Sequence, residues 1–572
     1  MHNTLSILLS DFYKQVHAEQ YNPSITKLVS YFTPRMTRIA GEDKLICFGI
    51  QAFCKEYLID HFNEYFFRKP EDEVIKEYNR ILTYSLGRGT YDDKKIRNLH
   101  KLGYLPIEIK CIPEGTRVPV KVPMIEISNT HPDFAWVTNA IESLMSATLW
   151  HTMLSANVGF NYRQIVNTWY DKNVADETPL LKARALGDFS FRGQHSLESA
   201  IKSSAAFCLS FLNTATVPTI PWLEYYYNCD CTKENVALGA ISTEHSVMCS
   251  NYAIDGDEKS FVKKLLTDIY SHKSFSMVSD SYDYWNMITN IIPSLANEIL
   301  DHDGALLIRG DSGDPVDIIC GKEIRLVFDT WNDFEKFKCS KDIVWVDEVI
   351  KVENSYYRFK NGTKQDSHAW ESLTNLPPEY KGTVECLWDT FGGSINAKGY
   401  KVLNPHIKAI YGDSITPQRC AEIYNRLEKK GFAANNVVLG VGSFSFMCLE
   451  NTTFIDTKYM PYTRDTFGIA VKATYGECGD KMFPIFKNPK TDSGNFKKSQ
   501  KGMCVVYKDI ENNCEITYDD EWNSKSIENI SELTDGMINE NLLQPIFKNG
   551  EMLHECTLKE IRDRLHSETG GF

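Results

Sequence analysis

Four short apolar runs in the sequence end abruptly in small or acidic residues, and these run ends hold the residue types best suited to chemistry. The runs are FSMVSDSYD (275–283), ALLIRGDSGDP (305–315), HIKAIYGDSIT (406–416) and NVVLGVGSFS (436–445). Three of them end in an aspartate, namely Asp280, Asp311 and Asp413, and the second also places Arg309 at its end. Carboxylates that gather at one place repel one another, so they need a cation or hydroxyl donors to stay ionised.

Two glycine-containing turns, YGDS (411–414) and GVGS (440–443), offer closely spaced backbone N–H groups of the kind that hold phosphate. Neither is a complete nucleotide motif, because GVGSFS lacks the third glycine of a dinucleotide fingerprint and no GxxxxGK[ST] loop occurs. Together with the aspartates, the turns predict a sugar-phosphate held by N–H groups, with its hydroxyls or a bound Mg²⁺ facing carboxylates. The alternative is that these turns merely cap helices.

Two further segments carry side chains that could bind a ligand. GDFSFRGQHS (187–196) places Phe189 and Arg192 three residues apart, so an aromatic face and a guanidinium could hold a planar ring and a phosphate. GAISTEHSVM (239–248) places His245 after a strand-like run, where the other runs have their aspartates. The alternatives are a core phenylalanine with a surface arginine, and a structural histidine.

The elements that must position these residues are alternating strands and helices. SITPQRCAEIYNRLEKKG (414–431) predicts a helix with Ser or Thr as N-cap, Pro417 near its first turn and Gly431 at its end. Helical spacing predicts one apolar face from Cys420, Ile423, Tyr424 and Leu427. Such alternation indicates βα units, whose parallel strands are buried on both faces and carry functional groups at their carboxyl ends. Arg309 and Asp311 are therefore expected at the rim of a barrel or sheet, facing a ligand.

The length of 572 residues exceeds what one hydrophobic core supports, so two or three domains are expected. We expect an N-terminal α+β domain over residues 1–178, a catalytic β/α domain over 179–445, and a C-terminal segment over 446–572 that packs with the N-terminal domain. Residues 320–385 contain alternating apolar and polar side chains and a YYRFKNGT turn signal, which predicts a β-rich insertion. TLKEIRDRL, near the C-terminus, predicts an amphipathic closing helix.

The composition argues against several classes of protein. The net charge of −14 and the pI of about 5.6 disfavour binding to nucleic acid or to anionic membranes. The first residues lack the basic stretch of a signal peptide, and no run of 18 or more apolar residues occurs. Cys229 and Cys231 could ligate a metal, but no second pair follows at zinc spacing, so we expect free thiols in a cytoplasmic protein.

Many motifs of the chain occur in the same order in one known family. The chain resembles the nicotinamide phosphoribosyltransferases, which are type II phosphoribosyltransferases, along nearly its whole length. The motifs that carry the resemblance are LLSDFYKQVHAEQYNP, YFTPR, GDFSFRG, STEHS, VSDSYDYWN, LLIRGDSGDP, LWDTFGGSINAKGYKVL, HIKAIYGDSIT, TRDTFGIAVKATY, PIFKNPKTD and KKSQKG. The insertion at 320–385 is the main unmatched block. The resemblance implies an α/β fold, with an irregular parallel β/α barrel and a second α+β domain built from N- and C-terminal segments.

The resemblance also implies a reaction of NAD salvage, in which nicotinamide and phosphoribosyl pyrophosphate (PRPP) give nicotinamide mononucleotide and pyrophosphate. It implies a homodimer with active sites at the interface. Tyr13 of one subunit and Phe189 of the other would sandwich the pyridine ring, with Asp11 beside Tyr13. Arg309 would donate to the carboxamide oxygen, and Ser276 would lie nearby in the pocket.

The same resemblance assigns the sugar and phosphate contacts. Arg192 would contact the ribose 5-phosphate together with the turn of Gly442 and Ser443, and Asp413 would accept from ribose hydroxyls. Asp280 and Asp311 would face Mg²⁺ and the reacting centre. His245 would be phosphorylated by ATP, which couples ATP hydrolysis to product formation. Cationic groups for pyrophosphate or ATP would be Arg35, Arg464, Lys472, Lys487 and Lys497.

One departure from the family leaves the choice of base open. Ala215, in FLNTATV, stands where the family usually has an acidic residue that accepts from the carboxamide NH₂, and Gly239 replaces a serine near the same pocket. A site that hydrogen-bonds a substrate group discriminates far better than an apolar one. Nicotinate is therefore the alternative base. A non-catalytic binding or adhesion protein that uses Arg309-Gly310-Asp311 is the alternative of another class.

Overall fold

The computed structural model of the chain describes residues 4–338, 349–359, 370–452, 457–487, 489, 491, 500–508, 522–527, 541–567 and 571–572. The chain packs as two compact units. Unit 1 comprises Met1–Asn161, Ser190–Leu238 and Ser443–Phe572, and unit 2 comprises Tyr162–Phe189 and Gly239–Gly442. Both ends of the chain thus contribute to unit 1. The structural division differs from the expected boundaries because residues 190–238 pack with unit 1 and residues 162–178 with unit 2.

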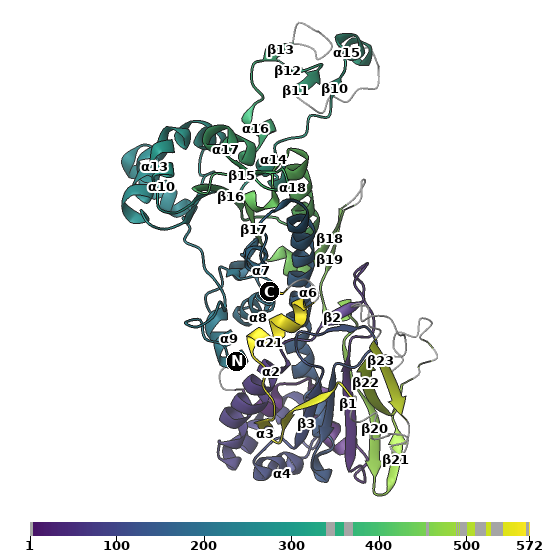
Figure 1. Cartoon of the computed structure of the whole chain (residues 1–572). Helices are drawn as coiled ribbons and strands as arrows, with labels where there is room; N and C mark the ends of the chain where they lie inside the picture. The colour runs from purple at the N-terminus through teal and green to yellow at the C-terminus, as the bar shows by residue number, and fades with distance from the viewer. Residues whose placement is uncertain are drawn as a thin grey trace. The chain divides into compact units, whose positions relative to one another are not determined.

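Unit 1 is built on an antiparallel sheet with the strand order β21-β20-β1-β5-β3-β24-β25. Its strands come from both chain ends: β1 (Lys27–Thr33), β3 (Ile107–Cys111), β5 (Ile125–Asn129), β20 (Ala470–Cys478), β21 (Lys481–Pro484), β24 (Gln544–Lys548) and β25 (Glu551–Met552). Figure 1 shows the green strand β20 beside the purple strand β1, and the two pair along the whole length of β1. This pairing confirms an α+β domain made from N- and C-terminal segments.

The helices of unit 1 include the predicted closing helix, α21 (Leu558–His566). The other main helices are α3 (Glu71–Leu86), α4 (Lys94–Leu102), α8 (Leu197–Phe207), α9 (Thr219–Tyr227) and the first part of α6 (Glu142–Asn173). Thr557 and Glu560 form a capping box at the start of α21, and the apolar face of α21 is buried. Arg562, also buried, donates to the carbonyl oxygens of Cys208 and Val236 at 2.7 Å. These bonds tie the C-terminal helix to the 190–238 segment.

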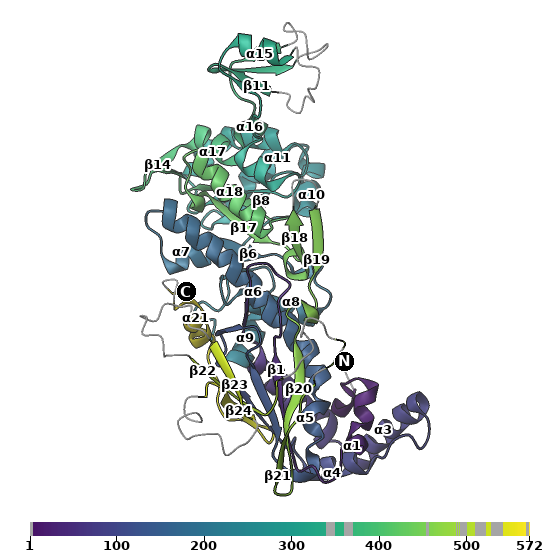
Figure 2. The ribbon, with the colours of Figure 1, turned by 90° about the vertical axis from the view of Figure 1, so that its right-hand side faces the viewer.

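Unit 2 contains five parallel strands in the order β6-β17-β16-β9-β8. The strands are β6 (Leu186–Asp188), β8 (Phe275–Val278), β9 (Leu306–Gly310), β16 (Ile407–Tyr411) and β17 (Val437–Val441). Helices α14 (Pro315–Cys320), α17 (Thr383–Phe391) and α18 (Pro417–Lys429) lie in the connections between them, and α17 packs against β16. Figure 2 labels α17 and α18 in this part of the chain. The parallel β/α fold expected for the catalytic part is confirmed, in the form of a half-barrel.

Helix α18 has the start, the end and the buried face that its own sequence predicts. The Thr416 hydroxyl caps the helix by accepting from the backbone N–H of Arg419, and Pro417 occupies the first helical position. The predicted apolar face is buried and consists of Cys420, Ile423, Tyr424 and Leu427. Gly431 follows the helix with a φ of +78°, a conformation that favours glycine.

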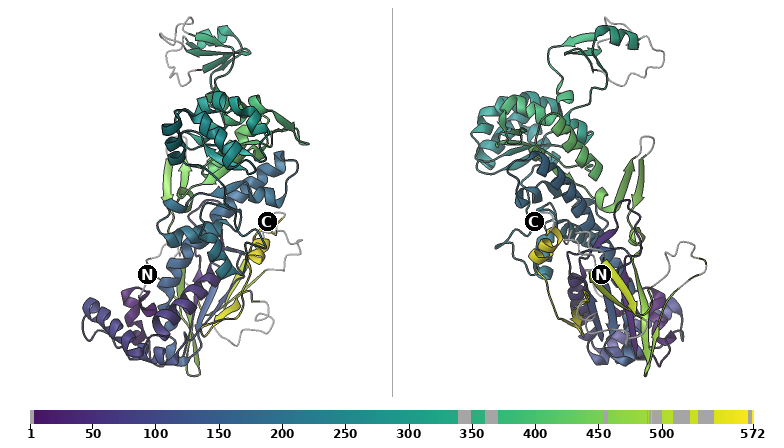
Figure 3. Two further views of the ribbon diagram at one scale, coloured as in Figure 1. Left: turned by 90° about the vertical axis from the view of Figure 1, so that its left-hand side faces the viewer. Right: turned by 45° about the vertical axis from the view of Figure 1, so that its right-hand side comes forward.

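The predicted β-rich insertion is present within residues 327–373. It is a four-stranded sheet, drawn in teal in Figures 1 and 3, of β10 (Val327–Phe328), β11 (Val349–Val352), β12 (Ser355–Phe359) and β13 (Trp370–Leu373), with α15 (Trp331–Lys338) packed on it. Its own core contains Phe334, Ile350, Val352 and Trp370. The hairpin turn between β11 and β12 lies at Glu353 and Asn354, whereas the glycine of the predicted YYRFKNGT turn lies outside the described residues.

The described residues also bear on membrane-spanning helices and on the state of the cysteines. None of the helices there combines the length and the apolar character needed to cross a bilayer. The cysteines there are free thiols, with Cys229 buried and Cys231 exposed. These are the free thiols that the sequence predicts.

Candidate active site

The carboxyl ends of the parallel strands bring the predicted polar residues of unit 2 to one edge. Arg309 pairs with Val278 of β8 on one side and with Ile410 of β16 on the other, so the residues that follow these strands lie next to one another. Val441 of β17 likewise pairs with Asp188 of β6. We call this edge the strand-end site, and it consists of Phe189, Asp280, Arg309, Asp311, Asp413 and Gly442.

Asp280 joins the ends of β8 and β9. Its side chain is only 4% exposed. One carboxylate oxygen accepts from the backbone N–H groups of Asp311 and Ser312, at 3.0 and 2.8 Å, and from the Ser312 hydroxyl at 2.6 Å. The other oxygen, Oδ1, is buried without a hydrogen-bond partner. A buried carboxylate oxygen without a partner is costly, so Oδ1 suits contact with a bound cation or a hydrogen-bond donor.

Arg309 points along the same edge and is held on both sides. Its Nη1 donates to the hydroxyl of Ser242 at 3.1 Å and to the carbonyl oxygen of Thr243 at 3.5 Å. Its Nη2 lies 3.6 Å from a carboxylate oxygen of Asp311. The Arg309-Gly310-Asp311 tripeptide is therefore the end of a strand in the sheet, with the arginine engaged internally. This geometry argues against an exposed adhesion loop.

Phe189 lies against the glycines of the neighbouring strand ends. A Cβ atom added to Gly440 would lie 2.2 Å from Cδ2 of the Phe189 ring, so only glycine leaves room for the ring there. A Cβ atom added to Gly412 would lie 3.2 Å from the same ring and 3.5 Å from Asp311. The Phe189 ring and the Asp311 carboxylate thus both lie next to Gly412. An aromatic face beside charged groups suits a flat heterocycle.

His245 begins helix α10 (His245–Asp255) and faces the carboxylates. Its Nε2 lies 3.9 Å from Asp280 and 3.8 Å from Asp311, while its Nδ1 is 3.1 Å from the hydroxyl of Ser281. The side chain is 48% exposed. Because Nδ1 is engaged with Ser281, Nε2 is the nitrogen that faces the reactive part of the site.

The pKa of Tyr411 is affected by the negative charges of the aspartates. Burial, followed by the negative charges of Asp413, Asp280 and Asp311, raises the pKa of Tyr411, so it stays a neutral phenol. Its hydroxyl donates to the carbonyl oxygen of Gly313 at 2.9 Å, which fixes the turn after β9. Asp413 itself is exposed and accepts from the hydroxyl of Ser414 at 2.9 Å.

The carboxylates fit an Mg²⁺ ion that arrives with a phosphorylated ligand. Among the described residues, no group of three or more His, Cys, Asp or Glu side chains has the arrangement of a metal centre. Mg²⁺ commonly binds through one or two carboxylates and takes its remaining ligands from substrate phosphates and water. The unpaired oxygen of Asp280 and the carboxylate of Asp311 provide that number of protein ligands.

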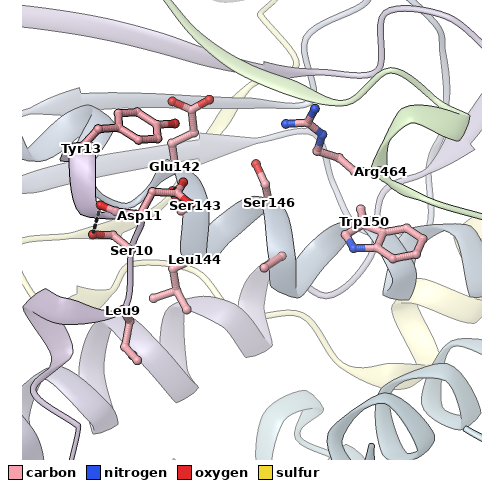
Figure 4. Close-up of a pocket in the computed structure, with 11 residues that line it drawn as sticks. Leu9, Ser10, Asp11, Tyr13, Glu142, Ser143, Leu144, Ser146, Trp150 and Arg464 are labelled. Carbon is pink, nitrogen blue, oxygen red and sulfur yellow. Dashed lines mark hydrogen bonds between the residues drawn. The ribbon is translucent and has the colours of Figure 1, made fainter. Parts of the chain in front are cut away.

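A second group of predicted residues meets in a pocket of unit 1, shown in Figure 4. The pocket has a volume of about 470 Å³ and contains Asp11, Tyr13 and Arg464, a size that suits a small-molecule ligand. Ser143 donates to the Asp11 carboxylate. Glu142, also in the lining, pairs with Lys472 at 3.2 Å. The structure thus groups Asp11, Tyr13 and Arg464, with Lys472 at the border.

Tyr13 is 58% exposed. Desolvation, followed by the charges of Asp11 and Glu142, raises the pKa of its hydroxyl. A neutral, exposed phenol ring is free to stack on a flat ligand.

The turn at 191–193 lies against Ser443, and both belong to unit 1. A Cβ atom added to Gly193 would lie 2.2 Å from the Ser443 hydroxyl, so the two residues are in close contact. Arg192, the residue before Gly193, is exposed. His151 holds the segment that follows Ser443, because its Nε2 donates to the carbonyl oxygen of Phe446 at 3.0 Å. Burial lowers the pKa of His151 to about 4, which keeps the ring neutral.

The remaining predicted cations are spread over unit 1. Arg35 donates from Nε to the carbonyl oxygen of Gly468 at 2.8 Å. Lys487 is exposed, and Lys497 lies outside the described residues. Of these two lysines, only Lys487 can be compared with the pocket of Figure 4, and it is not among the residues that line it.

Sequence reasoning missed several residues that border the strand-end site. Ser242, Thr243 and Ser281 hold Arg309 and His245, and Ser242 lies beside Ser276 with its hydroxyl 2.5 Å away. The sequence pattern around these residues gave little indication of a functional role, because serine and threonine beside a strand usually form hydrogen bonds with backbone groups. Ser276 was expected near Arg309, and the structure links the two through Ser242.

Comparisons with known proteins place the chain in a family. Residues 185–522, more than half of the chain, match the nicotinate phosphoribosyltransferase (NAPRTase) family, and residues 6–109 match the N-terminal domain of nicotinamide phosphoribosyltransferase. A nicotinamide phosphoribosyltransferase of Acinetobacter baylyi is 34% identical over 98% of this chain and 97% of its own. One of Mycoplasma genitalium is 28% identical over 87% of this chain and 94% of its own.

A solved structure shares the fold. The crystal structure of human nicotinic acid phosphoribosyltransferase superposes with a TM-score of 0.54 and 12% identity, covering 98% of this chain and 93% of that one. The match to the family model and the similarity to the Acinetobacter enzyme cover both the strand-end site and the N-terminal pocket. The chain therefore belongs to the nicotinate phosphoribosyltransferase (NAPRTase) family of pentosyltransferases.

Proposed function

We propose that the protein is a nicotinamide phosphoribosyltransferase of NAD salvage, which converts nicotinamide and PRPP into nicotinamide mononucleotide and pyrophosphate. The observation that supports this most is the strand-end site, where the Phe189 ring, the Arg309 guanidinium and the aspartates converge. The names of the relatives and the match to the N-terminal domain of that enzyme point to the same activity.

The reaction requires little acid–base chemistry from the protein. The pyridine nitrogen attacks the anomeric carbon of the ribose with its lone pair, the bond to pyrophosphate breaks, and no proton has to be removed from the base. The carboxylates of Asp311 and Asp413 suit the positive charge that develops on the ribose ring, and each preorganised charge of this kind contributes roughly 3–4 kcal/mol. Bound by Asp280 and Asp311, Mg²⁺ would supply positive charge against the leaving pyrophosphate.

The charge of the strand-end site favours a neutral base. Its guanidinium, on Arg309, already pairs with Asp311, and the site contains two further aspartates. Before Mg²⁺ binds, an anionic nicotinate would approach a net negative site, whereas nicotinamide carries no charge. One observation favours nicotinate as the base. Ala215 is exposed and has no side-chain acceptor for the NH₂ group of a carboxamide.

Product analysis tests the proposal. Purified protein is incubated with PRPP, Mg²⁺ and either base, with and without ATP, and the products are identified by mass spectrometry. We expect nicotinamide mononucleotide as the main product. Formation of nicotinate mononucleotide alone would favour the alternative base, and the absence of both mononucleotides would reject the enzyme.

We further propose a cytoplasmic homodimer in which Tyr13 of one subunit covers the ring that Phe189 of the other supports. Tyr13 is exposed in unit 1, as is the adjacent Phe12, so both rings are available to a partner. Free thiols among the described cysteines suit a reducing compartment. Sedimentation of the purified protein tests the dimer.

ATP coupling is proposed to proceed through His245. Nε2 would attack the γ-phosphorus of ATP and displace ADP, and the N-terminus of α10 would stabilise the phosphoryl charge. His245→Ala is expected to abolish the stimulation of product formation by ATP, while the rate without ATP falls far less. His272→Ala, at an exposed histidine, is the matched control. ATP stimulation that survives in His245→Ala would contradict this role.

Gly440→Ala is expected to displace the Phe189 ring, because the new Cβ atom would lie 2.2 Å from it. We expect KM for nicotinamide to rise about tenfold or more, with a loss of roughly 1–3 kcal/mol in unfolding free energy from overpacking. Ser85→Ala, at an exposed serine of α3 in unit 1, is the control. Steady-state kinetics and urea unfolding measure both effects, and an unchanged KM would show that the ring does not support the base.

A further inference from the structure

We propose that Ser242 selects the carboxamide substrate by fixing the direction in which the Ser276 hydroxyl donates its proton. This inference rests on the proposed function and adds a specificity-determining residue to it. Ser242 acts through Ser276 and is therefore a positioning residue, without a contact to the reacting atoms.

The backbone holds Ser242 directly beside Ser276. The two residues form a parallel bridge at the edge of the sheet, next to β8. Ser276 donates its N–H to the carbonyl oxygen of Ile241 at 2.8 Å and accepts from the N–H of Thr243 at 3.1 Å. The Thr243 hydroxyl accepts from the N–H of Val278 at 3.0 Å. The position of the Ser242 side chain is thus set by the sheet and does not depend on a ligand.

The hydrogen bonds of Ser242 leave one arrangement of protons. Its hydroxyl donates to the carbonyl oxygen of Thr243 at 3.1 Å. It accepts from Arg309 Nη1 at 3.1 Å and from the Ser276 hydroxyl at 2.5 Å. A serine hydroxyl has one proton and two lone pairs, so all three are in use. Ser276 must therefore give its only proton to Ser242.

The consequence is that Ser276 can only accept from a ligand. A carboxamide held by Arg309 through its oxygen can donate an N–H to the Ser276 oxygen. A carboxylate in the same place would set its own lone pairs against those of Ser276. Ser276 is 3% exposed, so water does not relieve this mismatch. The relay from Ser276 through Ser242 to the Thr243 carbonyl thus supplies a discrimination that Ala215 does not.

Ser242→Ala tests the relay, because it frees the Ser276 proton to point at the substrate. We expect kcat/KM for nicotinate to rise and the ratio of nicotinamide to nicotinate kcat/KM to fall by about tenfold or more. Ser242→Thr keeps the hydroxyl and is expected to restore the ratio. Ser250→Ala, on an exposed serine of α10 that bonds only to a backbone carbonyl, is the control.

The outcomes separate the two claims. A wild type that makes no nicotinamide mononucleotide would overturn the proposed function and this inference with it. A wild type that prefers nicotinamide, together with a Ser242→Ala variant that keeps the wild-type ratio, would overturn the inference alone. An equal loss for both bases would also overturn it, because a purely structural role lowers both rates and a proton-direction role raises one of them.

Discussion

Replacing Arg309 by alanine is expected to lower kcat/KM for nicotinamide by about 10²–10³-fold, the usual cost of removing one preorganised donor from an active site. The guanidinium joins the strand-end site to the segment beside it, since it donates to Ser242 and Thr243 and lies 3.6 Å from Asp311. Its loss would also leave the Asp311 carboxylate without its cation. Steady-state kinetics with both bases measures the effect.

Two matched variants sharpen this prediction. Arg309→Lys keeps the charge but loses the planar fork, so an intermediate loss is expected. Arg358→Ala removes an arginine of the insertion that pairs with Glu379 at 2.6 Å, and it is expected to leave the kinetics unchanged. Wild-type kinetics in Arg309→Ala would show that the base binds elsewhere.

The second large effect is expected for Asp280→Asn, which keeps the shape of the side chain and removes its charge. The asparagine oxygen can still accept from the N–H groups of Asp311 and Ser312, so the two strand ends stay joined. The unpaired Oδ1, however, becomes an NH₂ group that cannot bind a cation. We expect kcat to fall by about 10²–10³-fold and the Mg²⁺ concentration for half-maximal rate to rise.

Asp283→Asn is the control for Asp280→Asn. Asp283 caps α12 (Tyr284–Asn286) by accepting from the N–H of Asn286 at 3.0 Å, and asparagine caps a helix equally well. Magnesium titrations of the initial rate compare the two variants. If Asp280→Asn shows the wild-type dependence on Mg²⁺, Asp280 is not a ligand of the ion.

Much of the strand-end site followed from the sequence because it depends on short-range patterns. Continuous apolar runs identify buried parallel strands, and the polar residues that end each run lie at the carboxyl edge of the sheet. Asp280, Asp311 and Asp413 were placed in this way. Helix α18 was predicted to its caps and its apolar face, since both are local properties of residues 414–431.

The residues that were missed depend on contacts between distant segments. Ser242 matters because the 241–243 segment lies beside β8, a pairing that no local pattern of GAISTEHSVM indicates. Gly440 was predicted as part of a phosphate-binding turn, but its contact with the Phe189 ring could not be predicted, because the two residues are far apart in sequence.

The extent of unit 1 could not be predicted for the same reason. The buried Arg562 of α21 bonds to carbonyl oxygens within the 190–238 segment, so residues far apart in sequence form one unit. Sequence spacing carries no information on such a bond.

A crystal structure of the protein with nicotinamide mononucleotide bound tests the central claim most directly. We expect the pyridine ring against Phe189, the carboxamide oxygen within hydrogen-bonding distance of Arg309, and the ribose hydroxyls facing Asp413. A mononucleotide that binds away from the carboxyl ends of β8, β9, β16 and β17, and contacts none of these three residues, would contradict the account.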